Sequence, residues 1–283
     1  MFEIFHQTFV QNAFLAGTVI AIVSAVIGYF VVLRSQAFAA HALSHIGFAG
    51  ATGAALLGTS SLLGMFSFTL LAAFGMGALG KRIRGRDVEI GMILSFALGL
   101  GVLFLRLYTN SASEAVGVLF GSILSVTRGD VLLTLFFGVV SLVILTALFR
   151  PLVFVSIDPE VAEARGVRVQ LLGIIFMLLL AVTVAEAIQV VGVLLVFALL
   201  IVPAAVAQHL THKLFHTFFL SIVLGLLFTW GGLLLAFLTP YPVSFYIAGL
   251  AALTYFAAIN LSHVFAPHRE EITRHPGREV RWK

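Results

Sequence analysis

Long apolar blocks recur along this chain and constrain its fold more than any other feature. The blocks contain 18 residues or more, the length at which an α-helix crosses the hydrocarbon core of a bilayer. Hydrophobic residues make up 61% of the chain and charged residues only 10%. A soluble domain, by contrast, carries about 25% charged residues. The sequence therefore predicts an all-α polytopic membrane protein.

Nine apolar blocks are separated by charged or polar gaps. They cover residues 12–33, 38–57, 61–79, 88–108, 131–149, 170–189, 190–208, 216–238 and 244–263. The sixth and seventh blocks leave barely a turn between them at 187–192, so eight spans with one broken or re-entrant block is the alternative. We expect a bundle of eight to nine transmembrane helices over residues 1–263, followed by a basic tail over 264–283.

Basic residues gather in alternate gaps. If these gaps face the cytoplasm, fourteen of the 16 Lys and Arg residues lie inside, and only Arg106 and Arg128 lie outside or near outer span ends. Cytoplasmic loops of membrane proteins are enriched in Lys and Arg. We therefore expect a multi-pass protein of the plasma (inner) membrane with a cytoplasmic C-terminus. Because orientation explains the positive charge, we expect contact with membrane lipid and none with nucleic acid.

The long outer gap at about 109–130 carries a helix signal of its own. Ser111 or Ser113 can cap a helix. About ten apolar residues follow, a run too short to span a bilayer. We expect a re-entrant or interfacial helix packed on the bundle, because irregular backbone at membrane depth needs protein cover.

Histidine is the main candidate metal ligand, because the absence of cysteine excludes disulfides and thiolate metal sites. His41 and His45 stand four residues apart in a run of small apolar residues. On a helix these positions share a face, with Cβ atoms about 5–6 Å apart. Both rings can therefore reach one small cation. A pair of histidines hydrogen-bonded between helices is the alternative.

Glu186 is the one acidic residue far from any span end. A carboxylate buried in a membrane is costly and is a candidate functional residue by default. We therefore consider Glu186 a candidate metal ligand or gate. If the tight turn at 187–192 lies at the outer surface, Glu186 is instead near the mouth of a pathway.

Three further histidines, His209, His212 and His216, have helical spacing near Lys213. They fall at the cytoplasmic end of a span, where histidines are usually solvated or bonded to terminal carbonyls. An exit-side metal contact is the less favoured interpretation.

The segment 156–168 predicts a short cytoplasmic helix. Asp158 can cap it, Pro159 suits the first helical position and Glu160 suits the positive end of the helix dipole. Gly166 can end the helix. We favour a docking helix for a partner over a plain connecting loop, because a connector seldom needs both a cap and a glycine stop.

Four motifs occur in a fixed order along the chain. They are Val-Val-Leu-Arg at 31–34 with Leu43–His45, then Leu119–Leu124, then Ile157–Glu160 with Ala164–Val167, and finally Gln189–Val196 continuing to Leu199–Ala205. Together they resemble the permease subunit of bacterial zinc/manganese-type metal ABC importers. The likeness covers nearly the whole chain up to about residue 263.

This resemblance implies a homodimeric permease with a cytoplasmic ATPase on each half and an extracytoplasmic metal-binding protein that delivers the ion. The motif residues that it assigns to ATPase coupling are Asp158, Pro159, Glu160, Ala164 and Gly166. The chain has no Gly-x-x-x-x-Gly-Lys-Ser/Thr sequence, so it cannot bind ATP through a P-loop of its own. We therefore expect a transport permease, not an enzyme, powered by a separate subunit.

The second span departs from the family pattern Gly-Asp-x-Leu-x-His. His45 matches the family histidine, but Ala40 and His41 replace Gly-Asp, and Ser122 stands where the outer loop often has Asp. Imidazole suits zinc, whereas manganese favours oxygen ligands. We therefore expect zinc as the cargo, with manganese or another divalent metal as the alternative.

The expected site is incomplete, with His41, His45, water and Glu186 as ligands. A full four-ligand cage would hold the ion too tightly for transport, so we expect no resident cofactor. A secondary metal/proton transporter, with Glu186 coupling protons, is the rival function. An intramembrane metalloprotease is disfavoured because Ala42 stands where His-Glu-x-x-His has its general base.

Overall fold

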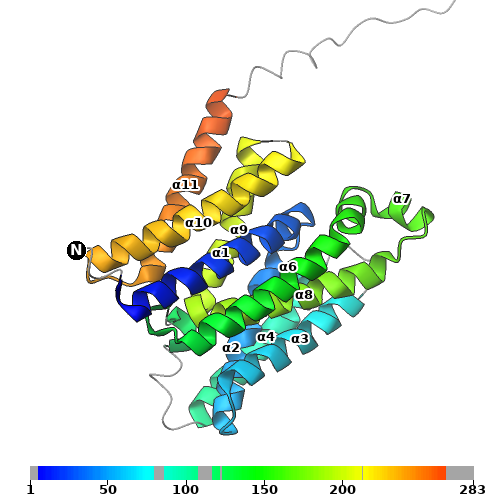
Figure 1. The fold of residues 1–283 in the computed structure, drawn as a ribbon. Helices are drawn as coiled ribbons and strands as arrows, with labels where there is room; N and C mark the ends of the chain where they lie inside the picture. The colour runs from blue at the N-terminus through cyan, green and yellow to red at the C-terminus, as the bar shows by residue number, and fades with distance from the viewer. Residues whose placement is uncertain (1–5, 80–85, 108–116, 122, 212, 266–283) are drawn as a thin grey trace, which may run out of the picture.

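The computed structural model describes residues 6–79, 86–107, 117–121, 123–211 and 213–265 (Figure 1). Within these ranges the regular structure is helical, without strands. The long helices are α1 (Thr8–Leu33), α2 (Ala37–Leu56), α3 (Ser61–Ala78), α4 (Arg86–Leu107), α6 (Arg128–Ile157), α8 (Val169–Val191), α9 (Val193–Leu210), α10 (Leu214–Leu238) and α11 (Val243–Phe265). The short ones are the 3₁₀ turn η2 (Ile123–Ser125) and α7 (Pro159–Ala164). The prediction of an all-α polytopic membrane protein is confirmed.

Eight of the described helices are long and apolar enough to cross a membrane, and α2 is the long helix that falls outside this set. The sequence of α2 includes two histidines, and 14 of its 20 residues are buried. It packs against α3, α4, α8 and α9. Protein therefore surrounds α2 where lipid surrounds more peripheral helices, which explains why it can be less hydrophobic.

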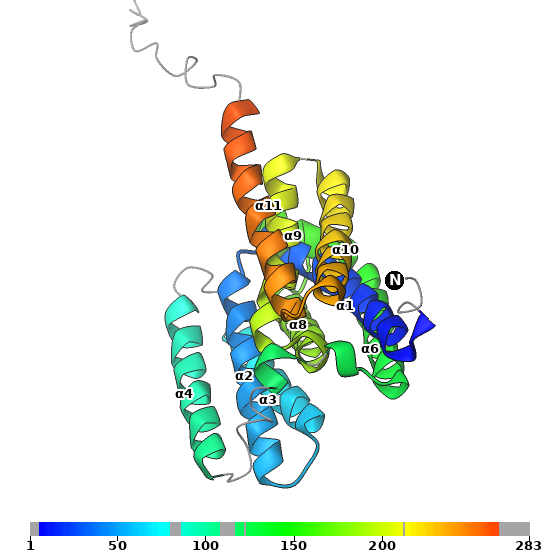
Figure 2. The same ribbon diagram turned by 90° about the vertical axis from the view of Figure 1, so that its left-hand side faces the viewer.

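The bundle is centred on α1 and α8. Helix α1 packs against α6, α9 and α10, while α8 packs against α2, α3 and α6 (Figure 1). Figure 2 shows α4 at the edge of the bundle beside α2. Helix α4 exposes several large apolar side chains that suit a lipid contact: Val88, Met92, Phe96, Val102, Leu103 and Leu107.

The predicted end of the fifth span, before Arg150, was wrong. Helix α6 continues through Pro151 to Ile157, two turns beyond the predicted boundary. Proline removes one intrahelical hydrogen bond, but the residues beyond it are held by tertiary packing, since Leu152 and Val155 are 0% and 3% exposed. The start of α6 is fixed by a capping box between Thr127 and Asp130.

Helices α8 and α9 are separated by a single residue, Gly192, with φ of +82°. The tight turn predicted within 187–192 is therefore present, and it lies at the end of that interval. Gly121, with φ of +74°, packs its backbone directly against Val191 and Gly192. Neither position has room for a Cβ, and both backbone conformations favour glycine.

The described part of the segment before α6 agrees in part with the helix predicted within 109–130. Residues 117–120 are helical, and η2 packs on α1 with Ile123 buried. The candidate caps Ser111 and Ser113 lie outside the described residues, and so does Ser122. The greater part of the predicted basic tail, 266–283, also lies outside them.

The predicted cytoplasmic helix is α7, and its sequence signals act as expected. The Asp158 carboxylate accepts hydrogen bonds from the backbone N–H groups of Glu160 and Val161, at 3.1 and 2.9 Å. Pro159 occupies the first helical position, and Gly166 follows the helix with φ of +83°. Ala162 is fully buried and anchors α7, which contacts α6 and α8 at one end of the bundle (Figure 1).

Candidate metal site

The two histidines of α2 lie side by side, as their spacing predicts. The His41 and His45 ring centroids are 4.6 Å apart, with the ring planes at 82°. Both residues are half-buried. The His41 ring also packs edge-on against Phe197 of α9, at 5.0 Å. The two imidazoles are therefore held close together at the contact between α2 and α9.

One ring nitrogen of this pair is without a protein partner. The buried Nδ1 of His41 has no hydrogen bond to any described residue. A buried polar atom ordinarily has a partner, so this nitrogen is available to a ligand that the protein does not supply. The other face of α2 is closely packed, because Gly47 meets Ile188 of α8 and Thr69 of α3.

Glu186 does not join the histidine pair. Residues Ile188 and Glu186 are two positions apart on α8, which turns their side chains about 200° from each other around the helix. Ile188 faces α2, whereas Glu186 approaches Gly138 of α6. Across the described ranges, no group of three or more His, Asp or Glu side chains could hold a metal ion. The three-residue ligand set expected from the sequence is therefore not assembled in this arrangement.

The histidine pair and Glu186 nevertheless lie at a similar depth in the bundle. The first turns of α2 and α8 line one cavity, and Gly47 meets Ile188 further along, so the two helices run in the same direction. His45 precedes Gly47 by two positions, and Glu186 precedes Ile188 by two positions. Helix α8 thus stands between the two polar groups.

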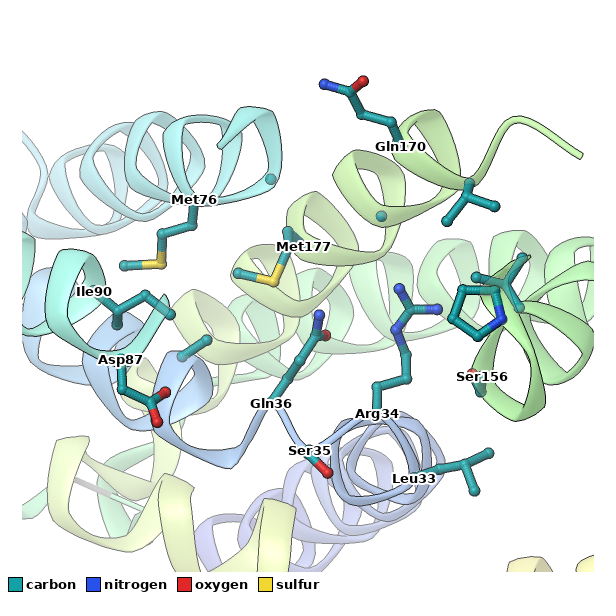
Figure 3. A pocket seen from close by; sticks show the side chains of 16 residues that line it. Leu33, Arg34, Ser35, Gln36, Met76, Asp87, Ile90, Ser156, Gln170 and Met177 are labelled. Atoms are coloured by element: carbon teal, nitrogen blue, oxygen red, sulfur yellow. The ribbon is translucent and has the colours of Figure 1, made fainter. Parts of the chain in front are cut away.

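A cavity of about 310 Å³ opens near the start of α2 (Figure 3). Residues that line it include Gln36 and Ala39 at the start of α2, Met177 of α8 and Pro159 of α7. The Arg34 guanidinium lies over the Phe176 ring at 5.3 Å, a favourable cation–π contact. The cavity therefore connects α7 with the helix that carries the histidine pair. Sequence reasoning missed it, because its lining comes from segments far apart in the chain.

The remaining polar candidates take structural or exposed positions. His209 is exposed and its ring lies 5.8 Å from that of Tyr255, while His216 is exposed on α10. His212 lies outside the described residues. Gln189 donates a hydrogen bond to Asp130 at 3.0 Å and so ties α8 to the start of α6.

Comparison with known proteins identifies the family. Residues 6–262 match the ABC 3 transport family. The manganese transport system membrane protein MntC of Listeria monocytogenes is 31% identical over 265 residues, covering 93% of this chain and 92% of the relative. The manganese import system permease protein ScaB of Streptococcus parasanguinis is 32% identical over 268 residues, covering 94% and 93%.

A solved structure agrees with these relatives. The structure of PsaBC from Streptococcus pneumoniae in complex with Fab matches with a TM-score of 0.80 at 29% identity, covering 94% of this chain and 95% of that chain. The resemblance predicted from the sequence motifs is thus confirmed. The chain belongs to the ABC 3 transport family and is a membrane permease subunit of the metal ABC importers, not an enzyme.

Proposed function

We propose that this permease imports a divalent transition metal ion and that His41 and His45 bind the ion in transit. The observation that carries the proposal is the histidine pair itself, with ring centroids 4.6 Å apart inside a membrane-embedded bundle. Polar residues are costly in a membrane and mark ion pathways. The pair supplies two nitrogen ligands, and water or a second copy of the chain supplies the rest.

Manganese is the first candidate for the cargo. The relatives MntC and ScaB are named for manganese, and none of the comparisons favours the zinc that we expected from the sequence. Zinc is the second candidate, because His41 and His45 offer imidazole nitrogens, which suit zinc better than manganese.

The half-buried state of the pair suits transport. A structural metal site closes all four ligand positions, whereas a site that must release its ion keeps positions open. His41 and His45 provide two ligands and stay partly exposed. An ion held in this way can be exchanged when the surrounding helices move.

Energy for this movement is supplied by an ATPase subunit that docks on α7. The Asp158 cap and Pro159 fix the start of α7, and Ala162 anchors it, while Glu160 and Ala164 remain exposed to a partner. Because Pro159 lines the same cavity as Gln36 and Ala39, a displacement of α7 reaches the first turn of α2. His41 lies one turn further along α2, and His45 one turn beyond it.

The complete transporter is a homodimer of this chain with an ATPase on each half and an extracytoplasmic metal-binding protein. Lys and Arg enrichment of the neighbouring gaps supports a cytoplasmic location of α7 and the C-terminus. The start of α2, and with it the cavity, then faces the cytoplasm. The turn at Gly192 faces the outside.

The test is uptake of manganese and of zinc into vesicles that contain the permease with its cognate ATPase, with and without ATP. We expect ATP-dependent uptake that is lost in His45→Ala and kept in the control His209→Ala, whose histidine is exposed. Uptake that needs no ATPase would instead favour a secondary transporter. Uptake indifferent to His41 and His45 would contradict the assigned site.

A further inference from the structure

A second set of polar side chains is buried on the neighbouring helices α6 and α8, away from the histidine pair. We call it the oxygen seam: Ser141 of α6 with Thr183 and Glu186 of α8. These side chains are 0%, 2% and 5% exposed. Helices α6 and α8 pack against each other and α1 packs against both, so the oxygen seam lies inside a single protomer.

The Glu186 carboxylate approaches the backbone of α6 at Gly138. A Cβ at Gly138 would lie 4.0 Å from Glu186 Oε1, 2.8 Å from a Val19 methyl and 3.2 Å from a Val23 methyl. The glycine therefore sits where α1, α6 and the Glu186 carboxylate meet. The missing side chain avoids a clash with the two valine methyls, and the carboxylate lies within ordinary contact distance of the same point.

The two hydroxyl residues are placed at a common depth. Helices α6 and α8 run in opposite directions, since the end of α6 and the start of α8 line the same cavity. Ser141 follows Gly138 by three residues and Thr183 precedes Glu186 by three, so both lie about 4.5 Å along the axis on the same side of the carboxylate.

The oxygens of the seam lack protein partners. Among the described residues, no group hydrogen-bonds to Ser141 Oγ, Thr183 Oγ1 or either Glu186 oxygen. Other hydroxyls in the bundle behave differently: Thr69 Oγ1 of α3 donates to the Met65 carbonyl and Thr146 Oγ1 of α6 donates to the Leu142 carbonyl, both at 2.7 Å. Four buried oxygens without protein partners therefore gather on two facing helices.

A ligand of positive charge would satisfy such a group. A buried carboxylate is strongly disfavoured unless it is paired, coordinated to a cation or neutralised. The donors are all oxygen, and such ligands suit hard divalent cations such as manganese, magnesium and calcium. We propose that the oxygen seam binds a hard divalent cation and forms a second metal site, separate from the histidine pair. This inference rests on the proposed function, because metal transport would bring manganese to the site.

The experiment measures manganese binding to the purified full transporter, with Mn²⁺ alone as the probe. Pulsed electron paramagnetic resonance separates manganese coupled to imidazole nitrogen from manganese bound by oxygen alone. We expect both populations in the native protein, at one ion each per protomer. Glu186→Gln should remove the nitrogen-free population and keep the nitrogen-coupled one, and His45→Ala should do the reverse.

A second variant keeps the test valid if Glu186→Gln does not fold. The double variant Ser141→Ala with Thr183→Val should weaken the nitrogen-free population about tenfold, as loss of supporting ligands typically does. The control Thr146→Val removes a hydroxyl whose partner is its own helix and should change nothing.

The two proposals fail in different ways. If Glu186→Gln and the double variant both leave the manganese count and the spectrum unchanged, the carboxyl is simply protonated and the second site is overturned. If only the nitrogen-coupled population is absent from the native protein, the histidine pair is wrong and the oxygen seam stands.

Discussion

The histidine pair and the oxygen seam occupy similar depths on opposite sides of α8, yet they differ in donor atoms and in enclosure. His41 and His45 offer nitrogen and are half-buried at the contact of α2 and α9. Glu186 offers oxygen and is 5% exposed beneath α1 and α6. One helix thus separates two proposed sites, one half-buried and one enclosed, and this difference predicts faster exchange of an ion at the first than at the second.

The largest effect should appear in the rate of ion release. In a chase of bound radioactive manganese, we expect two phases whose rates differ by about 100-fold, because differences between related sites appear mainly in dissociation rates. His45→Ala should remove the fast phase and Glu186→Gln the slow one. A single phase in the native protein would show that enclosure does not distinguish the two sites.

Packing of the oxygen seam can be tested at Gly138. Gly138→Ala should destabilise the protein by about 1–3 kcal/mol, the usual cost of overpacking, because the new Cβ would lie 2.8 Å from a Val19 methyl. Thermal unfolding in detergent measures the change. The control Gly99→Ala, where a Cβ meets nothing within 4 Å, should gain up to about 1 kcal/mol from helix propensity. Equal behaviour of the two variants would contradict the described contact.

Donor chemistry can be tested at the histidine pair. His41→Asp replaces a nitrogen ligand with an oxygen ligand, which manganese prefers. The ratio of manganese to zinc uptake should rise by about tenfold, equivalent to about 1.4 kcal/mol. Competition between the two metals in vesicle uptake measures this ratio. An unchanged ratio would mean that His41 is not a ligand.

The smallest effect distinguishes a hydroxyl without a partner from one with a partner. Thr69→Val should cost about 1 kcal/mol in the metal-free protein, because it removes a buried hydrogen bond to the Met65 carbonyl. Thr183→Val should be neutral or stabilising, since Thr183 Oγ1 has no partner among the described residues. Chemical unfolding measures the free energy of unfolding of both variants. A similar decrease in both would show that Thr183 is hydrogen-bonded after all.

Sequence reasoning succeeded where a single segment determines the outcome. The spacing of His41 and His45 places both rings on one helical face whatever surrounds it, and Asp158 with Pro159 fixes the start of α7 locally. The end of α6 was mispredicted because tertiary packing of Leu152 and Val155 overrides the local effect of Pro151.

The position of Glu186 could not be predicted for a related reason. Its sequence marks it as a buried acid, but only helix packing decides which side of α8 faces α2. Ser141 and Thr183 were missed altogether, because single small polar residues in apolar blocks give no periodic signal. Their importance appears only when α6 and α8 are seen side by side.

The contact between Gly121 and Gly192 has a mechanical consequence. The two backbones touch without room for any side chain, so Gly121 and the turn between α8 and α9 form one closely packed part. Two hydrogen bonds extend this part: Asn12 Nδ2 donates to the Val126 carbonyl at 3.1 Å, and Gln189 donates to Asp130. Helices α1, α6, α8 and α9 are therefore fastened together at this end. If α7 moves as proposed, the end of the bundle that carries α7 should therefore move more than this fastened end.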